Sequence, residues 1–232
     1  MQIPRHIAII MDGNRRWEKK NLMQISQGHI SGIKIIENIA KYAVKKEIDF
    51  LTIYAFSSEN WNRPKSEVSY LLKLLEDYLD NEKKEFLSND ICVVVSGNLN
   101  KIDESLQNKI KDIEHLTKNN KSLILNVAFS YGSRQEIIDA TKKIALAVSN
   151  NKIKLEDVDE KFFAKNLYQA NLPDPDLLIR TAGELRLSNF FLWQIAYTEF
   201  YFSEVFWPDF NKKNLLQAIE CFNKRERRYG KR

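Results

Sequence analysis

The chain has little cysteine and no long apolar run, and each shortage excludes a class of protein. Only two cysteines, Cys92 and Cys221, occur in 232 residues, far apart and outside any Cys-x-x-Cys or Cys/His spacing. This pattern argues against a zinc site and against a disulfide framework, and it favours a reducing compartment. No segment reaches the roughly 18 consecutive apolar residues of a membrane span. The apolar run near the N-terminus is too short for a signal peptide, so we expect a cytoplasmic protein.

Several motifs of nucleotide-binding proteins and hydrolases are missing as well. There is no GxxxxGK[ST] loop and no GxGxxG fingerprint, which argues against the nucleotide sites built on them. There is no GxSxG elbow, and Ser57 and Ser188 lack an evident His–Asp pair. A serine hydrolase is therefore not indicated.

The composition that remains suits one folded domain. Hydrophobic residues make up 44% of the chain, and 36 Lys+Arg against 31 Asp+Glu leave a mildly basic balance. This length suits a single domain with a real core, and we expect that domain to cover residues 1–232.

Short apolar runs alternate with longer amphipathic segments along the whole chain. The runs predict strands at His6–Met11, Phe50–Phe56, Ile91–Ser96, Leu123–Phe129, Leu177–Arg180 and Glu199–Val205. The longer segments predict helices at Gly32–Glu47, Ser66–Leu87, Ile102–Thr117, Arg134–Ser149 and about Asn211–Arg228. The alternation predicts an α/β fold with a mostly parallel, roughly six-stranded sheet flanked by helices.

The most informative segment is an apolar strand that ends in charged residues. Ile7–Met11 runs directly into Asp12-Gly13-Asn14-Arg15-Arg16-Trp17. Gly13 permits a tight turn close to a ligand, and free N–H groups at a helix start would face an anion. Arg16 can offer a planar fork to phosphate oxygens, whereas Asp12 can hold a Mg²⁺ that binds them. The segment therefore predicts a metal-assisted diphosphate site.

Polar clusters follow three further strands and begin at Ser57, Ser130 and Arg180. Ligands of open parallel sheets bind beyond the carboxyl ends of the strands, so all four clusters would lie on one edge. One or two diphosphates could bind there, and the candidate side chains are four arginines and two carboxylates: Arg16, Arg63, Arg180, Arg186, Asp12 and Glu199. An apolar cleft beside this edge would suit a lipid diphosphate, although most of the nearby aromatic residues are expected in the core.

Three segments resemble the signature motifs of the cis-prenyltransferases. They are His6–Asn14, Phe56–Pro64 and Arg180–Phe190, and Leu192–Glu199 and Trp207–Phe210 extend the match in the same order. The resemblance is nearest to the bacterial undecaprenyl diphosphate synthases and covers almost the whole chain. The DDxxD repeat of the all-trans prenyl synthases is absent.

The resemblance implies a homodimeric, Mg²⁺-dependent transferase with a hydrophobic tunnel. Such an enzyme adds isopentenyl diphosphate repeatedly, in cis, to an allylic diphosphate such as farnesyl diphosphate. The polyprenyl product, undecaprenyl diphosphate for example, would be a lipid-carrier precursor for cell-wall synthesis. Peripheral contact with a membrane would serve product release, and no nucleic acid is expected as a partner.

The resemblance also implies roles for individual residues. Asp12 matches the essential Mg²⁺ aspartate, and Glu199 matches a second metal-binding carboxylate. Asn60 matches a position assigned as proton acceptor; because an amide is a poor base, an orienting role is an equal alternative, with the released diphosphate or a water taking the proton. The loop that cradles the allylic diphosphate matches Gly13, Asn14, Arg15 and Arg16. Other substrate contacts match Trp17, His29, Ser57, Ser58, Glu59, Trp61, Arg63 and Leu187, and the isopentenyl diphosphate site matches Arg180, Arg186 and Ser188.

The chain departs from the family pattern at three positions. Arg15 stands where the family has glycine, Ile25 where it has arginine, and Ala182 where glycine is common. One interpretation is that Arg15 supplies the guanidinium missing at Ile25, and the other is that Arg15 faces solvent.

Two other classes of protein remain as alternatives. A non-catalytic partner subunit would lack the metal aspartate and its loop, which this chain has. A nucleic-acid-binding module could use the basic C-terminal tail, but such a short charge run is typical of a solvated surface. The tail Arg228-Tyr229-Gly230 instead resembles a family ending that reaches the neighbouring subunit.

Overall fold

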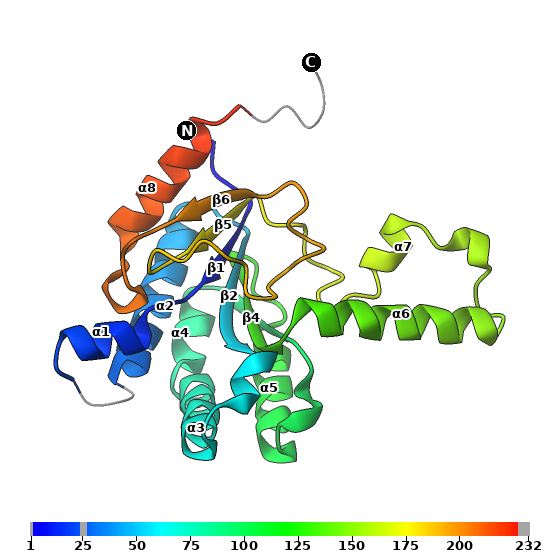
Figure 1. The fold of residues 1–232 in the computed structure, drawn as a ribbon, viewed down its shortest axis with the longest axis horizontal. Helices are drawn as coiled ribbons and strands as arrows, with labels where there is room; N and C mark the ends of the chain where they lie inside the picture. Colours follow the sequence, from blue (N-terminus) through cyan, green and yellow to red (C-terminus); the bar gives the residue numbers. More distant parts are fainter. Residues whose placement is uncertain (1, 24–26, 227–232) are drawn as a thin grey trace.

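Six parallel strands form the centre of the molecule (Figure 1). The computed structural model describes residues 2–23 and 27–226. The strands are β1 His6–Ile10, β2 Phe50–Ser57, β3 Ile91–Ser96, β4 Leu123–Tyr131, β5 Leu177–Arg180 and β6 Glu199–Phe202, in the order β3-β4-β2-β1-β5-β6. Every neighbouring pair is parallel, which confirms the predicted fold class.

Helices connect the strands and cover the sheet (Figure 1). They are α1 Asn14–Lys20, α2 Gln27–Lys45, α3 Lys65–Asn81, α4 Lys83–Ser88, α5 Glu104–Thr117, α6 Ser133–Ser149, α7 Glu160–Ala164 and α8 Lys212–Asn223. Short 3₁₀ turns occur at η1 Ser58–Asn62, η2 Leu99–Lys101, η3 Leu155–Asp157 and η4 Trp207–Asp209. In the part of the chain that the structure describes, no helix combines the length and the apolarity needed to cross a bilayer.

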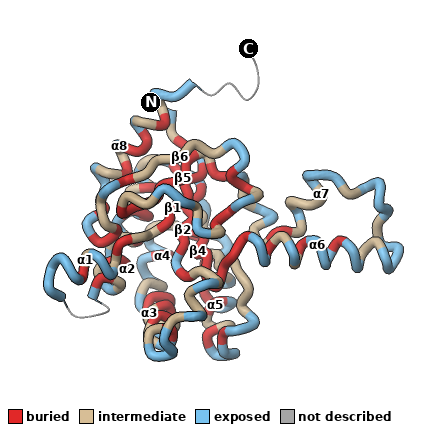
Figure 2. Tube along the Cα trace, viewed as in Figure 1, coloured by how far each residue is buried: buried red, intermediate tan, exposed pale blue. Residues whose placement is uncertain are grey.

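The sheet has a large core on one face and a smaller aromatic one on the other. Side chains alternate along a strand, so β1 sends Ile7 and Ile9 into the large core and Ala8 and Ile10 into the small one. Both faces of β1 are therefore covered, which explains its uninterrupted apolar sequence. The buried residues in Figure 2 lie mainly along the strands and the helix faces beside them, whereas the arm formed by α6 and α7 projects from the body with much of its surface exposed.

The prediction of one helix over Ser66–Leu87 was wrong, because the structure divides it into α3 and α4 at Glu82. In an unbroken helix Tyr78 and Phe86 would be about 12 Å apart along the axis. The break lets the two rings meet edge to face, with centroids 5.7 Å apart. The apolar spacing continues across Glu82, so periodicity could not show the break.

Two predicted elements are shorter in the structure. β6 ends at Phe202 rather than Val205, because its partner β5 ends at Arg180. α8 ends at Asn223, whose side-chain amide donates to the carbonyls of Ile219 and Gln2. The predicted extension of this helix to Arg228 reaches beyond the described residues.

We expect Phe86→Ala to lower the free energy of unfolding by about 3–5 kcal/mol, because it empties a buried ring site under α3. Leu87→Ala is the matched control, since Leu87 is the next residue of α4 and is exposed; its effect should stay within about 0.5 kcal/mol. Urea unfolding measures both, and equal losses would show that α4 is not anchored through Phe86.

Candidate active site

The four strands that end in polar clusters are neighbours in the sheet. β4, β2, β1 and β5 lie side by side and parallel, so their carboxyl ends form one continuous edge. This arrangement confirms that the clusters after the strands converge. It places residues that are more than 160 positions apart in the sequence within hydrogen-bond distance.

The backbone of Asp12 is held firmly at this edge. Its N–H donates to the Thr181 hydroxyl at 2.8 Å, and that hydroxyl donates to the Asp12 carbonyl at 2.7 Å. The same carbonyl accepts the Trp207 N–H at 3.0 Å. Gly13 then takes a positive φ of 104°, and a Cβ there would lie 2.9 Å from that of Ala182. The turn after β1 therefore requires glycine at position 13.

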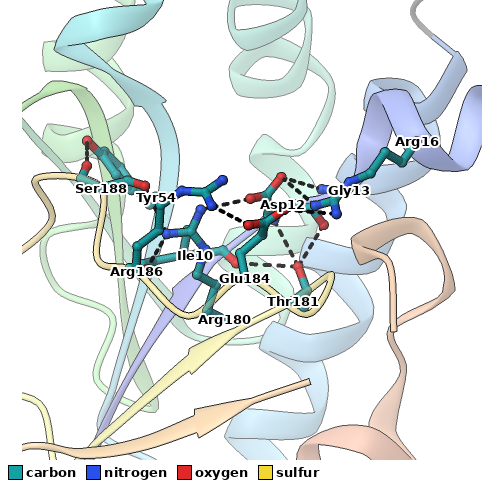
Figure 3. A network of polar contacts seen from close by, with 10 residues as sticks. All are labelled: Ile10, Asp12, Gly13, Arg16, Tyr54, Arg180, Thr181, Glu184, Arg186 and Ser188. Atoms are coloured by element: carbon teal, nitrogen blue, oxygen red, sulfur yellow. Dashed lines mark hydrogen bonds and ion pairs between the residues drawn. The ribbon is translucent and has the colours of Figure 1, made fainter. Parts of the chain in front are cut away.

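The carboxylate of Asp12 pairs with Arg180, the last residue of β5 (Figure 3). Its Oδ2 accepts from Arg180 Nη2 at 2.8 Å, and its Oδ1 accepts the Gly13 N–H at 2.7 Å, with Arg16 3.6 Å away. Burial favours the neutral acid, but the hydrogen bond and charge of Arg180, followed by Gly13 and Arg16, outweigh it. The pKa of Asp12 is therefore held below its ordinary value, and the group is a carboxylate at neutral pH.

Arg180 joins the predicted isopentenyl diphosphate residues into one cluster. Its side chain is only 3% exposed. Nη1 donates to the Ser188 hydroxyl at 2.9 Å and to the carbonyl of Arg186. The carbonyl of Ser188 accepts from the Tyr54 hydroxyl at 3.3 Å, so the loop after β5 is tied to β2 (Figure 3).

The outer arginines of the site are joined by Glu184 (Figure 3). Glu184 Oε1 lies 2.9 Å from Arg16 Nη1, and its Oε2 accepts from Arg186. Arginines and carboxylates therefore alternate along the edge, in the order Arg186, Glu184, Arg16, Asp12 and Arg180. Each of these arginines already has a carboxylate partner within the chain.

The cluster after β2 is held by its own hydrogen bonds. Asn60 Oδ1 accepts the Ser57 N–H at 3.0 Å and closes the η1 turn. The Glu59 carboxylate accepts from Asn189 Nδ2 at 2.8 Å. Burial opposes its ionisation, but the bonds from Asn189 and the Ser58 hydroxyl keep the pKa of Glu59 below its ordinary value. The amide of Asn60 is thus fixed by a backbone bond, as an orienting role requires.

Two residues of this edge were not predicted, Thr181 and Asn189. Thr181 fixes Asp12, and Asn189 joins Glu59 to the start of α6, where its carbonyl accepts the Ser133 N–H at 2.8 Å. Both belong to the Arg180–Phe190 segment, so the motif contained them. Their partners are distant in the sequence, so spacing alone gave no sign of these contacts.

Arg15 and Arg63 share one partner, Glu67 of α3. Arg15 Nη2 lies 2.8 Å from Glu67 Oε2, and Arg63 Nη1 lies 2.9 Å from Oε1. The Arg15 side chain is 60% exposed. Ile25, the other half of the proposed exchange, lies outside the described residues.

Buried polar atoms without a partner mark the same edge. Among the described residues, none forms a hydrogen bond with Asn14 Oδ1, His29 Nδ1 or Arg180 Nε. His29 Nδ1 lies 3.9 Å from the nearest oxygen of Glu18, and burial lowers the pKa of the imidazole. Such buried groups call for an explanation, and a polar ligand at this edge would supply their missing partners.

Four predicted contact residues support the rim rather than line the cavity. Trp17 Nε1 donates to Asp209 at 2.7 Å, and Trp61 Nε1 donates to the Ser130 hydroxyl at 2.9 Å. Ser58 donates to the Glu59 carboxylate at 3.1 Å. Leu187 packs against the small aromatic core.

Glu199 is not brought to Asp12. It is the first residue of β6 and stands beside Leu177, whereas Arg180, the partner of Asp12, stands beside Phe202. Three residues of strand separate the two positions by about 10 Å. The Glu199 carboxylate instead pairs with Arg225 at 2.7 Å. The two carboxylates of one chain therefore do not meet at a common site.

A cavity of about 570 Å³ begins at this edge and continues into the large core. Polar residues line its mouth: Asp12, Asn14, His29, Ser57, Glu59, Asn60, Arg63, Arg180, Ser188 and Asn189. Apolar and aromatic residues line its depth: Ile33, Ile36, Ile53, Leu71, Leu74, Leu75, Tyr78, Val127 and Phe129. A ligand with a charged head and a hydrocarbon tail fits this division.

The comparison with known proteins agrees with this geometry. The family model described as "Putative undecaprenyl diphosphate synthase" matches residues 10–230. The chain belongs to this prenyltransferase family. It is 50% identical to an isoprenyl transferase of Fusobacterium nucleatum, over 98% of this chain and 96% of the relative. It is 47% identical to the farnesyl-diphosphate-specific ditrans,polycis-undecaprenyl-diphosphate synthase of Haemophilus influenzae, over 98% and 95%.

Two solved structures of related prenyl diphosphate synthases share the fold. Lavandulyl diphosphate synthase from Lavandula x intermedia, in complex with dimethylallyl diphosphate, superposes with a TM-score of 0.95 at 39% identity, covering 98% of each chain. A probable undecaprenyl diphosphate synthase from Campylobacter jejuni gives 0.82 at 34% identity, covering 100% of each. Family membership makes this chain a prenyltransferase and implies prenyl diphosphates as its substrates.

If Arg15 replaces the guanidinium missing at Ile25, Arg15→Gly should weaken farnesyl diphosphate binding by about 1.5–3 kcal/mol, the range for a charged hydrogen bond. Ile25→Arg in that background should restore much of the loss, while isopentenyl diphosphate affinity changes far less. A double-mutant cycle on farnesyl diphosphate affinity measures the coupling. Purely additive effects would show that Arg15 serves only Glu67 and the solvent.

Proposed function

We propose that this protein catalyses the Mg²⁺-dependent, sequential cis-condensation of isopentenyl diphosphate onto an allylic diphosphate. The observation that carries the proposal is the cavity, which joins a polar mouth that includes Arg63 and Arg180 to an apolar depth. Its mouth suits the diphosphate, and its depth suits a growing hydrocarbon chain, in a domain that we take to span residues 1–232. Farnesyl diphosphate is the proposed primer, and a polyprenyl diphosphate such as undecaprenyl diphosphate is the proposed product.

Asp12 is the residue that fits a Mg²⁺ ion. Its carboxylate is ionised, and hard oxygen ligands suit this ion. Mg²⁺ is commonly bound by one or two carboxylates together with substrate phosphates. No group of three or more potential metal ligands occurs among residues 2–23 and 27–226, so the diphosphate would supply the other ligands. When bound, the ion would stabilise negative charge on the departing diphosphate.

The residues of the chain would perform the rest of the reaction. Arg16 would bind the allylic diphosphate at the Asp12 turn, and Arg180, Arg186 and Ser188 would bind the isopentenyl diphosphate. Holding the two substrates side by side supplies much of the reduction in the barrier. Asn60, fixed by the Ser57 N–H, would orient the isopentenyl group, while the released diphosphate or a water takes the proton.

The geometry of the site favours a catalytic protein over a non-catalytic partner subunit and over a nucleic-acid-binding module. A non-catalytic subunit has no need of an ionised Asp12 held by Thr181 and Gly13 at a cavity mouth. A nucleic-acid surface has no need of a deep apolar cavity. We further propose a cytoplasmic enzyme that contacts the membrane surface when it releases a lipid product for cell-wall synthesis.

Asp12→Ala should abolish condensation while the fold remains intact, because it removes the metal ligand and the partner of Arg180. The loss would be several kcal/mol of transition-state stabilisation. The assay measures incorporation of radiolabelled isopentenyl diphosphate, with and without Mg²⁺. Comparison of farnesyl with dimethylallyl diphosphate as the allylic substrate identifies the preferred primer. Asp112→Ala, on the exposed surface of α5, is the matched control and should retain full activity. Turnover near the wild-type rate in folded Asp12→Ala would refute the mechanism.

We propose a homodimer, and the arm formed by α6 and α7 offers the surface. Ile138 and Leu146 of α6 and Leu155 beyond it are exposed apolar residues on this projecting segment (Figure 1). Leu146→Glu should convert a dimer to a monomer in light scattering, with Lys142→Glu, also exposed on α6, as the charge control. A wild-type protein that is already monomeric would contradict the proposal.

A related prediction concerns the C-terminal tail, which we propose reaches the isopentenyl diphosphate site of the neighbouring subunit. Arg228-Tyr229-Gly230 lies outside the described residues, so only the measurement can decide. Truncation before Arg228 should raise KM for isopentenyl diphosphate or lower kcat, with a smaller effect on stability. Unchanged kinetics in the truncated protein would refute the role of the tail.

A further inference from the structure

Glu18 of α1 is a charged side chain that the fold buries. It is only 4% exposed, whereas the four basic residues of the same short helix are all exposed. Burying a carboxylate is costly unless hydrogen bonds or opposite charges compensate for the lost water. The groups around Glu18 therefore have to explain its position.

The first neighbour of Glu18 is the start of α2. α1 lies beside this end of α2 (Figure 1), and Glu18 Oε1 accepts the Gly28 N–H at 2.9 Å. A Cβ at position 28 would lie 2.7 Å from the Asn14 carbonyl oxygen and 3.0 Å from Glu18 Oε1, so glycine permits this close approach. The first N–H groups of a helix have no partner within it, and Glu18 satisfies one of them. This contact needs a hydrogen-bond acceptor but not a charge.

The second neighbour of Glu18 is His29, at the mouth of the cavity. Glu18 Oε1 lies 3.9 Å from His29 Nδ1, which is beyond hydrogen-bond distance. Nδ1 is buried, and no described residue forms a hydrogen bond with it. His29 also belongs to the lining of the cavity, and its side chain is 18% exposed. The imidazole therefore lies between a buried carboxylate and the mouth that a diphosphate would enter.

The charged groups around His29 come from three elements. Burial lowers the pKa of the imidazole, and the charge of Glu18 opposes this effect. Arg63, after η1, and Arg15 of α1 lower the pKa further, whereas Glu67 of α3 raises it. His29 is therefore neutral at neutral pH in the free protein. A diphosphate would add negative charge on the cavity side, and nearby negative charge favours the imidazolium.

We propose that Glu18 is a positioning residue that couples diphosphate binding to the uptake of a proton by His29. When the allylic diphosphate enters the mouth, the imidazole takes one proton from the solvent. Its Nδ1–H then donates to Glu18, and its Nε2–H donates to a phosphate oxygen. The site gains a positive charge only when the diphosphate is present, and Glu18 compensates that charge from behind. This inference rests on the proposed condensation activity and deepens the account of its allylic site.

NMR of the imidazole groups in the full-length protein tests the protonation directly. The chain has three histidines, and His29→Gln identifies the signal of His29. At about pH 7.5 that signal should be of a neutral imidazole in the free protein, and of an imidazolium after addition of farnesyl diphosphate and Mg²⁺ without isopentenyl diphosphate. A signal that stays neutral with farnesyl diphosphate bound would overturn the proposal.

Titration calorimetry in buffers of different ionisation enthalpy counts the protons taken up on the same binding step. Glu18→Gln keeps an acceptor for the Gly28 N–H but lacks the charge, so it should take up fewer protons than the wild type, by up to about one per site. Its affinity for farnesyl diphosphate should be about tenfold weaker, the effect of one pKa unit. The difference should shrink as the pH rises through the pKa of His29 in the complex, because the proton is then lost from the wild type as well.

Two further variants separate the charge of Glu18 from its structural contact. In the His29→Gln background, Glu18→Gln should cause little further loss of affinity, because the group that it positions is already absent. Glu104→Gln, on the exposed first turn of α5, is the matched control for the loss of one carboxylate and should bind like the wild type. Thermal unfolding of free Glu18→Gln should stay close to that of the wild type, since the hydrogen bond to α2 is retained.

The outcomes separate this inference from the activity on which it rests. Equal proton uptake and affinity in Glu18→Gln and the wild type would overturn it and leave Glu18 as a cap of α2. If Glu18→Gln does not fold, the NMR measurement on the wild-type protein decides. Proton-coupled binding of farnesyl diphosphate without condensation would refute the proposed function but not the role of Glu18. A wild-type protein that binds no farnesyl diphosphate would overturn both.

Discussion

The ion pair between Asp12 and Arg180 is the contact on which the site depends. Arg180 is almost completely buried, and a buried guanidinium is tolerated only when a partner compensates the loss of water. Asp12 is that partner, and it joins the ends of β1 and β5, which are neighbours in the sheet. Because Thr181 and Trp207 hold the Asp12 backbone, the carboxylate occupies its place before any substrate arrives. Fixed charges of this kind need no rearrangement during a reaction, which is the condition for electrostatic stabilisation.

The other cations of the site are held by internal carboxylates. Glu184 pairs with both Arg16 and Arg186, and Glu67 pairs with both Arg15 and Arg63. A diphosphate that binds to these arginines therefore meets guanidiniums that already have a carboxylate partner. The internal ion pairs avoid a cluster of unpaired positive charges in the free protein. The affinity for a diphosphate then depends on the difference between the ion pairs it forms and those it weakens.

The sheet separates the chemistry from the hydrocarbon. Polar residues follow the carboxyl ends of β4, β2, β1 and β5, whereas the helices beneath the sheet supply leucine and isoleucine. The cavity passes from one region to the other, and α3, which begins two residues after Arg63, lines it with Leu71, Leu74, Leu75 and Tyr78. One helix therefore connects the binding of the charged head with the space for the apolar tail.

The sequence by itself determined the strands, the fold class and the edge of the sheet at which the polar clusters meet. Apolar runs that end in Asp12 or Arg180 are local signals, and parallel strands must bring their carboxyl ends together. The tertiary structure decided what depends on distant partners. The register of β6 placed Glu199 at the opposite end of its strand from the site. The helix breaks at Glu82, where the rings of Tyr78 and Phe86 meet. The fold also pairs Asn189 with Glu59 and Arg15 with Glu67. The pairs Asn189–Glu59 and Arg15–Glu67 join segments tens of residues apart, and periodicity along one segment carries no information about which side chain another segment will present.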